Sequence, residues 1–226
     1  MNPKTMKLFA LITTVVLAVF LAGPAHAQKR RQPADDPKLP RVLLIGDSIS
    51  MGYTPEVQKL LAGKANVHRI PTNGGQTTKG LENLKAWLGD GKWDVVHFNW
   101  GLHDLKFGND GKKLVSPEDY EKNLRELVSR LKATNAKLIW CATTPVPDGD
   151  LKPGRKNSDV LAYNAIARKI MDEHGVAIDE LYEFALPQLK EIQLPNNVHF
   201  SPAGSAVLAK QVVASIELAL PKPTTP

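Results

Sequence analysis

Short apolar runs alternate with longer stretches of helical period along most of the chain. Runs of strand length lie at residues 41–46, 66–71, 93–101, 136–144 and 176–181. Helical spacing of apolar residues fills the intervals 54–63, 77–89, 116–134 and 158–175, and a last helix is expected over residues 202–220. Because strands that alternate with helices form parallel sheets covered on both faces, this order predicts a three-layer α/β/α domain with five parallel strands.

The expected helices carry recognisable end signals. Thr54 stands before Pro55, and Ser116 stands before another Pro, which is the arrangement of an N-cap followed by the first helical residue. Ser158 is expected to cap the next helix, and Gly175 is expected to end it.

The two ends of the chain lack the alternating strand and helix patterns of its middle. Residues 1–27 combine a basic start, a short apolar run and a small-x-small site ending at Ala27, which predicts a signal peptide cleaved after that residue. A periplasmic or secreted protein without a stable membrane anchor is therefore expected. Residues 28–40 are rich in charge and Pro and predict a flexible linker, residues 41–220 the domain, and residues 221–226 a disordered tail.

Composition removes several classes of function. The formal net charge is +6, but part of it lies in the leader and linker rather than on one clustered face, so nucleic-acid binding is not expected. Cys141 is the sole cysteine and lies in an apolar run, which favours a buried side chain over a nucleophile. The histidines are scattered and no Walker-type phosphate loop is present, so neither a metal nor another cofactor is expected.

Polar residues gather where three strands end and where the last helix begins. The stretches are GDSIS, NGGQTT, NWGLHD and NNVHFS. Ligands of parallel sheets bind at the carboxyl ends of the strands, so these stretches are expected to face one crevice. Ser48 is the candidate nucleophile and His199 its base. The backbone N–H groups of Ser48 and Gly75, with the ring of His103, are the candidate oxyanion donors.

These blocks resemble those of the SGNH/GDSL hydrolase family in order and spacing, over about residues 41–220. The resemblance implies a flavodoxin-like esterase fold with a Ser–His–Asp triad. It also implies an oxyanion hole built from the Ser backbone, a Gly and an Asn. On the matching positions it assigns Ser48 as nucleophile, His199 as base and Gly75 as an oxyanion donor.

Two positions depart from the family pattern. His103 stands where the family has Asn, and its ring N–H can still donate. Asn196 stands in the slot of the triad Asp, three residues before His199, and cannot stabilise an imidazolium by charge. Either another acceptor, such as a backbone carbonyl or Asp104, orients His199, or catalysis is weak or lost. Asp47 is expected to orient the nucleophile turn and Asp104 to brace its loop.

Each candidate also has a purely structural interpretation. Ser48 could be a helix cap, His199 a packed loop residue and His103 a structural hydrogen-bond partner. Four aromatic residues at or near strand ends could be core residues or a platform for a sugar ring: Tyr53, Trp100, Phe107 and Trp140.

The sequence therefore predicts a secreted serine esterase acting through an acyl-serine intermediate. The family resemblance favours small acyl groups, acetyl first, on a carbohydrate. The alternatives are a lipase- or thioesterase-type acylhydrolase, and a carbohydrate-binding domain on a hydrolase fold that has lost activity.

Overall fold

The computed structural model describes residues 34–147 and 149–221. The strands are β1 (Arg41–Ile45), β2 (Asn66–Arg69), β3 (Val95–Phe98), β4 (Lys137–Cys141) and β5 (Ala177–Asp179). The helices are α1 (Ser48–Leu60), α2 (Thr77–Leu88), α3 (Pro117–Lys132), α4 (Asn157–His174), α5 (Leu181–Ala185), α6 (Leu189–Ile192) and α7 (Pro202–Ala219), with a 3-10 turn, Leu186–Gln188, between α5 and α6.

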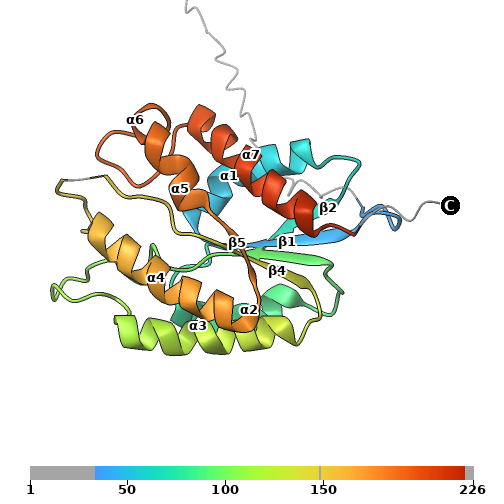
Figure 1. The fold of residues 1–226 in the computed structure, drawn as a ribbon, viewed down its shortest axis with the longest axis horizontal. Coiled ribbons are helices and arrows are strands. Elements are labelled where there is room, and N and C mark those ends of the chain that lie inside the picture. The colour runs from blue at the N-terminus through green and yellow to red at the C-terminus, as the bar shows by residue number, and fades with distance from the viewer. Residues whose placement is uncertain (1–33, 148, 222–226) are drawn as a thin grey trace, which may run out of the picture. The chain divides into compact units, whose positions relative to one another are not determined.

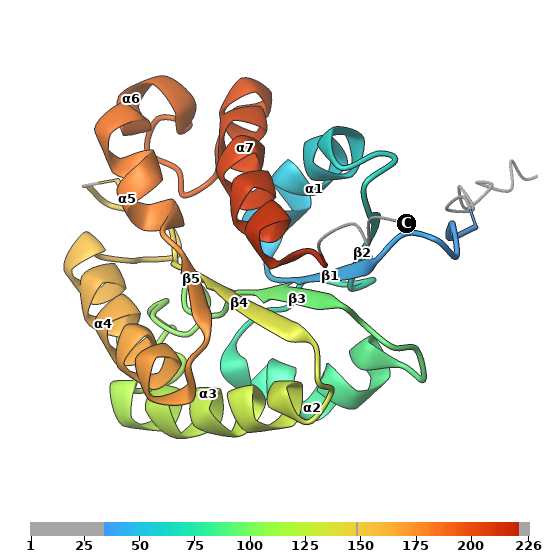
Figure 2. The ribbon, with the colours of Figure 1, turned by 45° about the vertical axis from the view of Figure 1, so that its right-hand side comes forward.

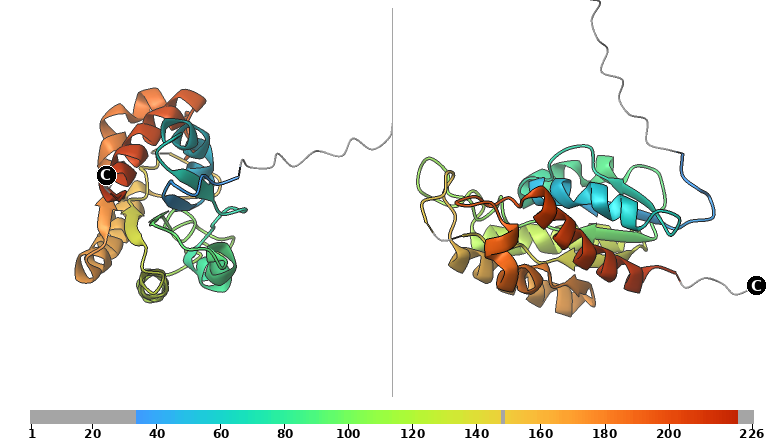
Figure 3. Two further views of the ribbon diagram at one scale, coloured as in Figure 1. Left: turned by 90° about the vertical axis from the view of Figure 1, so that its right-hand side faces the viewer. Right: turned by 90° about the horizontal axis from the view of Figure 1, so that it is seen from above.

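The five strands form one parallel sheet in the order β2-β1-β3-β4-β5. Helices α1, α5, α6 and α7 cover one face and α2, α3 and α4 cover the other (Figure 1, Figure 2). Seen from above, α1 and α7 lie side by side on their face (Figure 3). The predicted three-layer α/β/α sandwich with a five-stranded, flavodoxin-like sheet is confirmed, and the carboxyl ends of β1, β3 and β4 open at one rim.

The sheet supplies most of the core because its central strands are apolar on both faces. Val42, Leu43, Leu44 and Ile45 of β1 are each at most 2% exposed. Burying one such side chain contributes about 1.5–3 kcal/mol, so this strand is a rigid base for the turn that follows it.

Helix α1 starts earlier than the sequence predicts. It begins at Ser48 rather than after Thr54, its N-cap is Asp47, and Pro55 lies inside it. Proline removes one helical hydrogen bond, but Pro55 is on the exposed face, where water can satisfy the freed carbonyl of Met51. The nucleophile candidate is therefore the first residue of a helix rather than part of a free loop.

Other end signals are partly confirmed. Ser116 caps α3 by accepting from the backbone N of Asp119, and Gly175 ends α4 in the left-handed conformation. The expected Ser158 cap is wrong, because α4 already includes Asn157 and its N-cap, Lys156, makes no side-chain capping bond. Helices α5 and α6 were not foreseen, because each is too short to show a helical period.

One residue of the predicted linker contacts the domain. Asp35, placed by sequence in the linker, pairs with Arg41 at 2.8 Å and His68 at 2.7 Å. The predicted signal peptide and most of the predicted tail lie outside the described residues. No helix in the described ranges is both long and apolar enough to cross a membrane.

Candidate active site

Ser48 is the first residue of α1, directly after the sharp turn that follows β1, at the rim where the central strands end. The carboxylate of Asp47 accepts the backbone N–H of Ile49 at 2.9 Å, which caps the helix and fixes the turn. Asp47 thus holds this turn through its capping bond. The first N–H groups of a helix have no acceptor within the helix, so the Ser48 amide is available to an anion there.

His199 reaches Ser48 from the loop between α6 and α7. This loop is held by two backbone bonds, Leu194 N to His199 O at 2.9 Å and Ser201 N to Ile192 O at 3.0 Å. His199 Nε2 lies 2.8 Å from Ser48 Oγ. The structure thus brings together two residues 151 positions apart, at hydrogen-bonding distance and in a setting open to solvent.

Asn197 holds the other side of the His199 ring. Its Oδ1 lies 2.8 Å from His199 Nδ1 and also accepts the backbone N–H of His199 at 3.0 Å. A backbone N–H can only donate, so the amide oxygen, not the nitrogen, must face this corner. The ring therefore carries its proton on Nδ1, and Nε2 accepts the hydroxyl proton of Ser48. This is the tautomer that a general base requires.

Asn196 does not make this contact. The sequence comparison put it in the triad position, but the structure places the neighbouring residue, Asn197, against the ring. Asn196 instead takes a left-handed backbone conformation, with φ of 51°. Of the alternatives raised from the sequence, neither a backbone carbonyl nor Asp104 orients the ring. The NNVH stretch held a usable signal, because an Asn two residues before a given N–H commonly accepts it in an Asx turn.

Gly75 lies in the loop after β2, in the left-handed region with φ of +63°. Its backbone N–H donates to Asn73 Oδ1 at 2.9 Å. The N–H of the preceding Gly74 donates to Gly46 O, also at 2.9 Å, which ties this loop to the nucleophile turn. Asn73 was not singled out from the sequence. The Asn73 carboxamide accepts the Gly75 N–H, which is the donor that an oxyanion would use. Asn73 must therefore share or release this N–H when an oxyanion forms.

His103 lines the same cavity as Ser48 and His199. Burial lowers its pKa, the cations Arg155, Lys106 and Lys79 lower it further, and Asp47 opposes them. The ring is therefore neutral near pH 7, with one N–H to donate and one nitrogen to accept.

Among the described residues, the side chain of Asp104 bonds to Thr77 and not to His199. One carboxylate oxygen accepts from Thr77 N at 2.8 Å and from Thr77 Oγ1 at 2.6 Å, at the start of α2. The other oxygen is buried without a partner among the described residues. Burial raises the pKa of Asp104 to about 7, although the bonds from Thr77 act to lower it.

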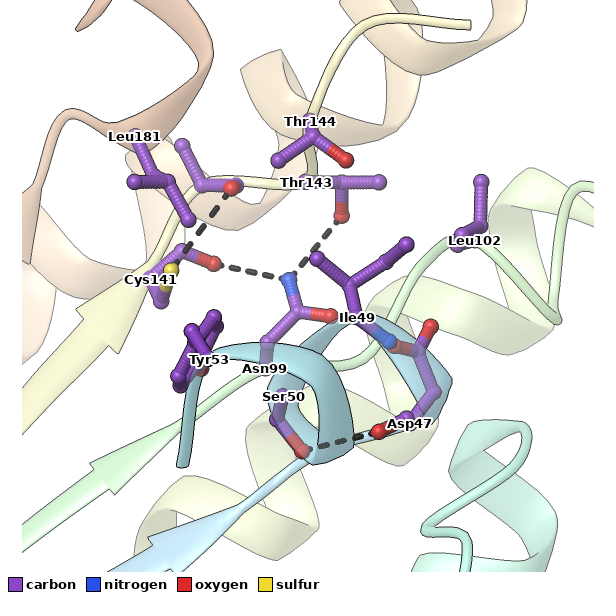
Figure 4. Close-up of a pocket in the computed structure, with 11 residues that line it drawn as sticks. Asp47, Ile49, Ser50, Tyr53, Asn99, Leu102, Cys141, Thr143, Thr144 and Leu181 are labelled. Atoms are coloured by element: carbon purple, nitrogen blue, oxygen red, sulfur yellow. Dashed lines mark hydrogen bonds between the residues drawn. The ribbon is translucent and has the colours of Figure 1, made fainter. Parts of the chain in front are cut away.

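The rim beneath the site is cross-linked by polar side chains (Figure 4). Asn99, just after β3, donates from Nδ2 to Cys141 O at 2.7 Å and to Thr143 Oγ1 at 3.1 Å. Ser50 Oγ donates to Asp47 O at 2.8 Å. These residues surround a cavity of about 10 Å³, which holds one water molecule at most. This packing joins the ends of β3 and β4 to the nucleophile turn.

Three of the four candidate platform aromatics are core residues. Tyr53, Trp100 and Trp140 are each at most 2% exposed and cannot stack on a sugar. Phe107 is partly exposed, with the ammonium of Lys156 5.8 Å from its ring centre.

One buried cluster could in principle hold a metal. His97, Cys141 and Asp179 bring a ligand atom each within 4.8 Å of one another. However, His97 Nε2 already lies 2.9 Å from Asp179 Oδ2, and Gln211 donates to the other oxygen at 3.0 Å. All three are at most 2% exposed, and Cys141 is buried as expected. The cluster is better described as a hydrogen-bonded part of the core.

Ser48 and His199 open into a cavity of about 460 Å³. Its lining combines amides, imidazoles and basic groups with apolar side chains. The lining includes Asn73, Leu102, His103, Lys106, Leu151, Lys152, Pro153, Arg155, Asn196, Asn197 and Val198. It can take a small acyl group and a polar alcohol.

Known proteins share this fold. The model of the GDSL-like Lipase/Acylhydrolase family matches residues 44–207. A lipase/acylhydrolase from Enterococcus faecalis superposes with a TM-score of 0.69 at 23% identity, covering 83% of this chain and 100% of that one. Axe2, an acetylxylan esterase from Geobacillus stearothermophilus, gives 0.65 at 20% identity, covering 78% and 94%. No curated protein sequence matches this chain.

The fold, the serine at the head of α1 and the histidine before α7 define a hydrolase of the SGNH/GDSL class. The chain belongs to the GDSL-like lipase/acylhydrolase family, and it is an enzyme of the esterase and acylhydrolase type. The resemblance drawn from the sequence is thereby confirmed.

Proposed function

We propose that this protein is an exported serine esterase that removes small acyl groups, acetyl first, from carbohydrate. The observation that carries the proposal is the 2.8 Å contact between Ser48 Oγ and His199 Nε2, with the ring held in the base tautomer by Asn197. A serine hydroxyl is a weak nucleophile until such a base accepts its proton.

The chemical steps follow from this geometry. Ser48 Oγ attacks the ester carbonyl carbon while its proton moves to His199 Nε2. The negative oxygen is held by the Ser48 backbone N–H, with Gly75 N–H and the His103 ring as further donors. The C–O bond to the alcohol then breaks, and His199 returns the proton to the leaving alkoxide. Water then loses a proton to His199 and attacks the acyl carbon of acyl-Ser48. The bond from this carbon to Ser48 Oγ breaks, His199 returns the proton to Oγ, and the acid is released.

The cavity supports the choice of substrate. A long fatty chain needs an extended apolar channel, whereas this cavity has many polar groups and opens to solvent at His199 and Asn197. A hydroxyl-rich alcohol can exchange its water contacts for contacts with Asn73, Asn196 and Asn197. The acetylxylan esterase among the structural neighbours is consistent with an acetyl group, although its identity to this chain is low.

Export rests on the leader pattern of residues 1–27, which mass determination of the N-terminus of the mature protein tests directly.

The activity is tested by hydrolysis of p-nitrophenyl acetate, butyrate and octanoate, and by acetate release from acetylated xylan. We expect acetyl esters to react fastest and Ser48→Ala to abolish all turnover. A preference for octanoate supports the lipase-type alternative instead. Binding of oligosaccharides without hydrolysis by the wild-type protein supports the alternative of a carbohydrate-binding domain.

A further inference from the structure

Three cationic side chains line the candidate substrate cavity beside Ser48. Lys106 follows the His103 loop, and Lys152 and Arg155 lie in the loop before α4. None of the three forms an ion pair with a carboxylate within the described ranges, whereas Lys113, for example, pairs with Asp159 at 2.5 Å.

The side chain of Arg155 is held in a fixed position. Its side chain is largely buried, Nε donates to Leu102 O at 2.8 Å, and Nη1 contacts Pro153 O at 3.3 Å. These bonds turn the guanidinium toward the cavity and leave Nη2 without an acceptor in the part of the chain that the structure describes. A buried arginine held this way presents a fixed fork for a planar oxyanion.

Among the described residues that line this cavity, three are cationic and none is a carboxylate. Asp47 acts on the pKa of both Arg155 and His103, while Arg155, Lys106 and Lys79 act on the pKa of His103 as cations. Asp47 is itself buried and engaged as the cap of α1. Such a cavity concentrates anions and disfavours cations.

We propose that the cavity binds esters of acidic saccharides, with a carboxylate or sulfate on the sugar held by Arg155, Lys106 and Lys152. The proposal rests on the esterase function proposed above and names its substrate class. The shared chemistry is an oxyanion close to the scissile ester. A neutral acetylated sugar leaves all three cations unpaired, whereas an acidic one neutralises them.

The test separates binding from turnover. The Ser48→Ala protein is titrated by calorimetry with oligogalacturonate, a sulfated galactan oligosaccharide and a neutral xylo-oligosaccharide. We expect the acidic ligands to bind at least about tenfold more tightly, with an affinity that falls as salt rises. Comparing the affinity for oligogalacturonate with that for the sulfated oligosaccharide identifies whether the site prefers a carboxylate or a sulfate.

Point variants localise the effect. Lys106→Gln and Lys152→Gln, each combined with Ser48→Ala, should weaken acidic ligands about three- to fivefold and leave the neutral one unchanged, as for partly exposed ion pairs. Lys85→Gln, which removes an exposed charge in the last turn of α2, is the matched control and should change nothing. Arg155 is left intact because it also holds Leu102.

In the wild type, kcat/KM is measured for acetylated polygalacturonate and for acetylated xylan. We expect a higher value for the acidic substrate, through a lower KM. Equal affinity for acidic and neutral ligands overturns the proposal, while Ser48-dependent hydrolysis of p-nitrophenyl acetate would leave the esterase function standing. Charge-dependent binding without hydrolysis of any ester would support the anion site and contradict the proposed esterase function.

Discussion

The side-chain oxygen of Asn197 lies 2.8 Å from Nδ1 of His199 and 3.0 Å from its backbone nitrogen. Replacing the aspartate of a serine-protease triad by asparagine lowers turnover by about 10⁴, because the amide selects the wrong tautomer. Here the backbone N–H fixes the amide orientation, so the correct tautomer is kept. What the asparagine lacks is the negative charge that would stabilise the imidazolium.

The first prediction concerns that charge. Asn197→Asp should raise kcat on p-nitrophenyl acetate about tenfold, which corresponds to about 1.4 kcal/mol of added stabilisation of the imidazolium. Asn197→Leu removes the acceptor and should lower kcat about 100-fold. Asn196→Asp is the matched control, because Asn196 does not touch the ring. A gain in Asn196→Asp and none in Asn197→Asp would reverse this assignment.

The second prediction concerns the neutral ring of His103. His103→Ala should lower kcat about 10²-fold, the effect of losing one oxyanion donor, with little change in KM. His103→Asn restores an N–H donor at the position where the family has Asn, so it should recover most of the loss. If alanine and asparagine behave alike, His103 does not donate to the reacting oxygen.

The third prediction concerns stability and pH. The pKa of Asp104 is raised from 3.8 to about 7 in the folded protein. Between these values the folded state holds a proton that the unfolded chain has released. The contribution of this group to stability is therefore full below about pH 4, falls as pH rises from there, and is lost above about pH 7.

Asp104→Asn keeps an oxygen for Thr77 and removes the buried charge. The variant should melt above the wild type at about pH 8 and close to it only at about pH 4 or below, by thermal unfolding monitored with circular dichroism. The difference is on the order of a few kcal/mol in the free energy of unfolding. A difference that does not change with pH would mean that Asp104 does not titrate in this range.

The fourth prediction concerns the close packing of α7, at Gly204, against the start of the His199 loop, at Ile192. A Cβ on Gly204 would lie 2.1 Å from Ile192 O, so Gly204→Ala must displace α7 from the loop or unfold locally. We expect a loss of several kcal/mol in stability, at the upper end for single substitutions, together with reduced activity. Gly111→Ala, where φ is +73° but no atom lies within 4 Å, should cost only about 1–2 kcal/mol. Equal losses in the two variants would contradict this explanation.

The layered fold could be predicted because its signals are local and repeated. Buried strands such as β1 appear as continuous apolar runs, and the cap at Ser116 needs only its own neighbours. The start of α1 could not be predicted from such signals, since Pro55 looks like a first helical residue. It is tolerated inside the helix only because the tertiary structure exposes that face.

The site was predictable only in part. The sequence predicted that Ser48, His103 and His199 share one crevice, and all three line the same cavity, but it did not single out Asn73 or Asn197. Which of two adjacent asparagines meets the ring depends on the left-handed turn at Asn196, a choice that the loop backbone makes. The orientation of Arg155 depends on two carbonyls from separate loops and leaves no trace in the local sequence.

The most direct test of the central claim is reaction with a fluorophosphonate, followed by peptide mass spectrometry of wild type and Ser48→Ala. An activated serine reacts, whereas an ordinary surface serine does not. The account predicts one adduct, on Ser48, lost in Ser48→Ala and retained in Asn196→Asp. Hydrolysis of acetyl esters without an adduct on Ser48, or with the adduct on another residue, would contradict it.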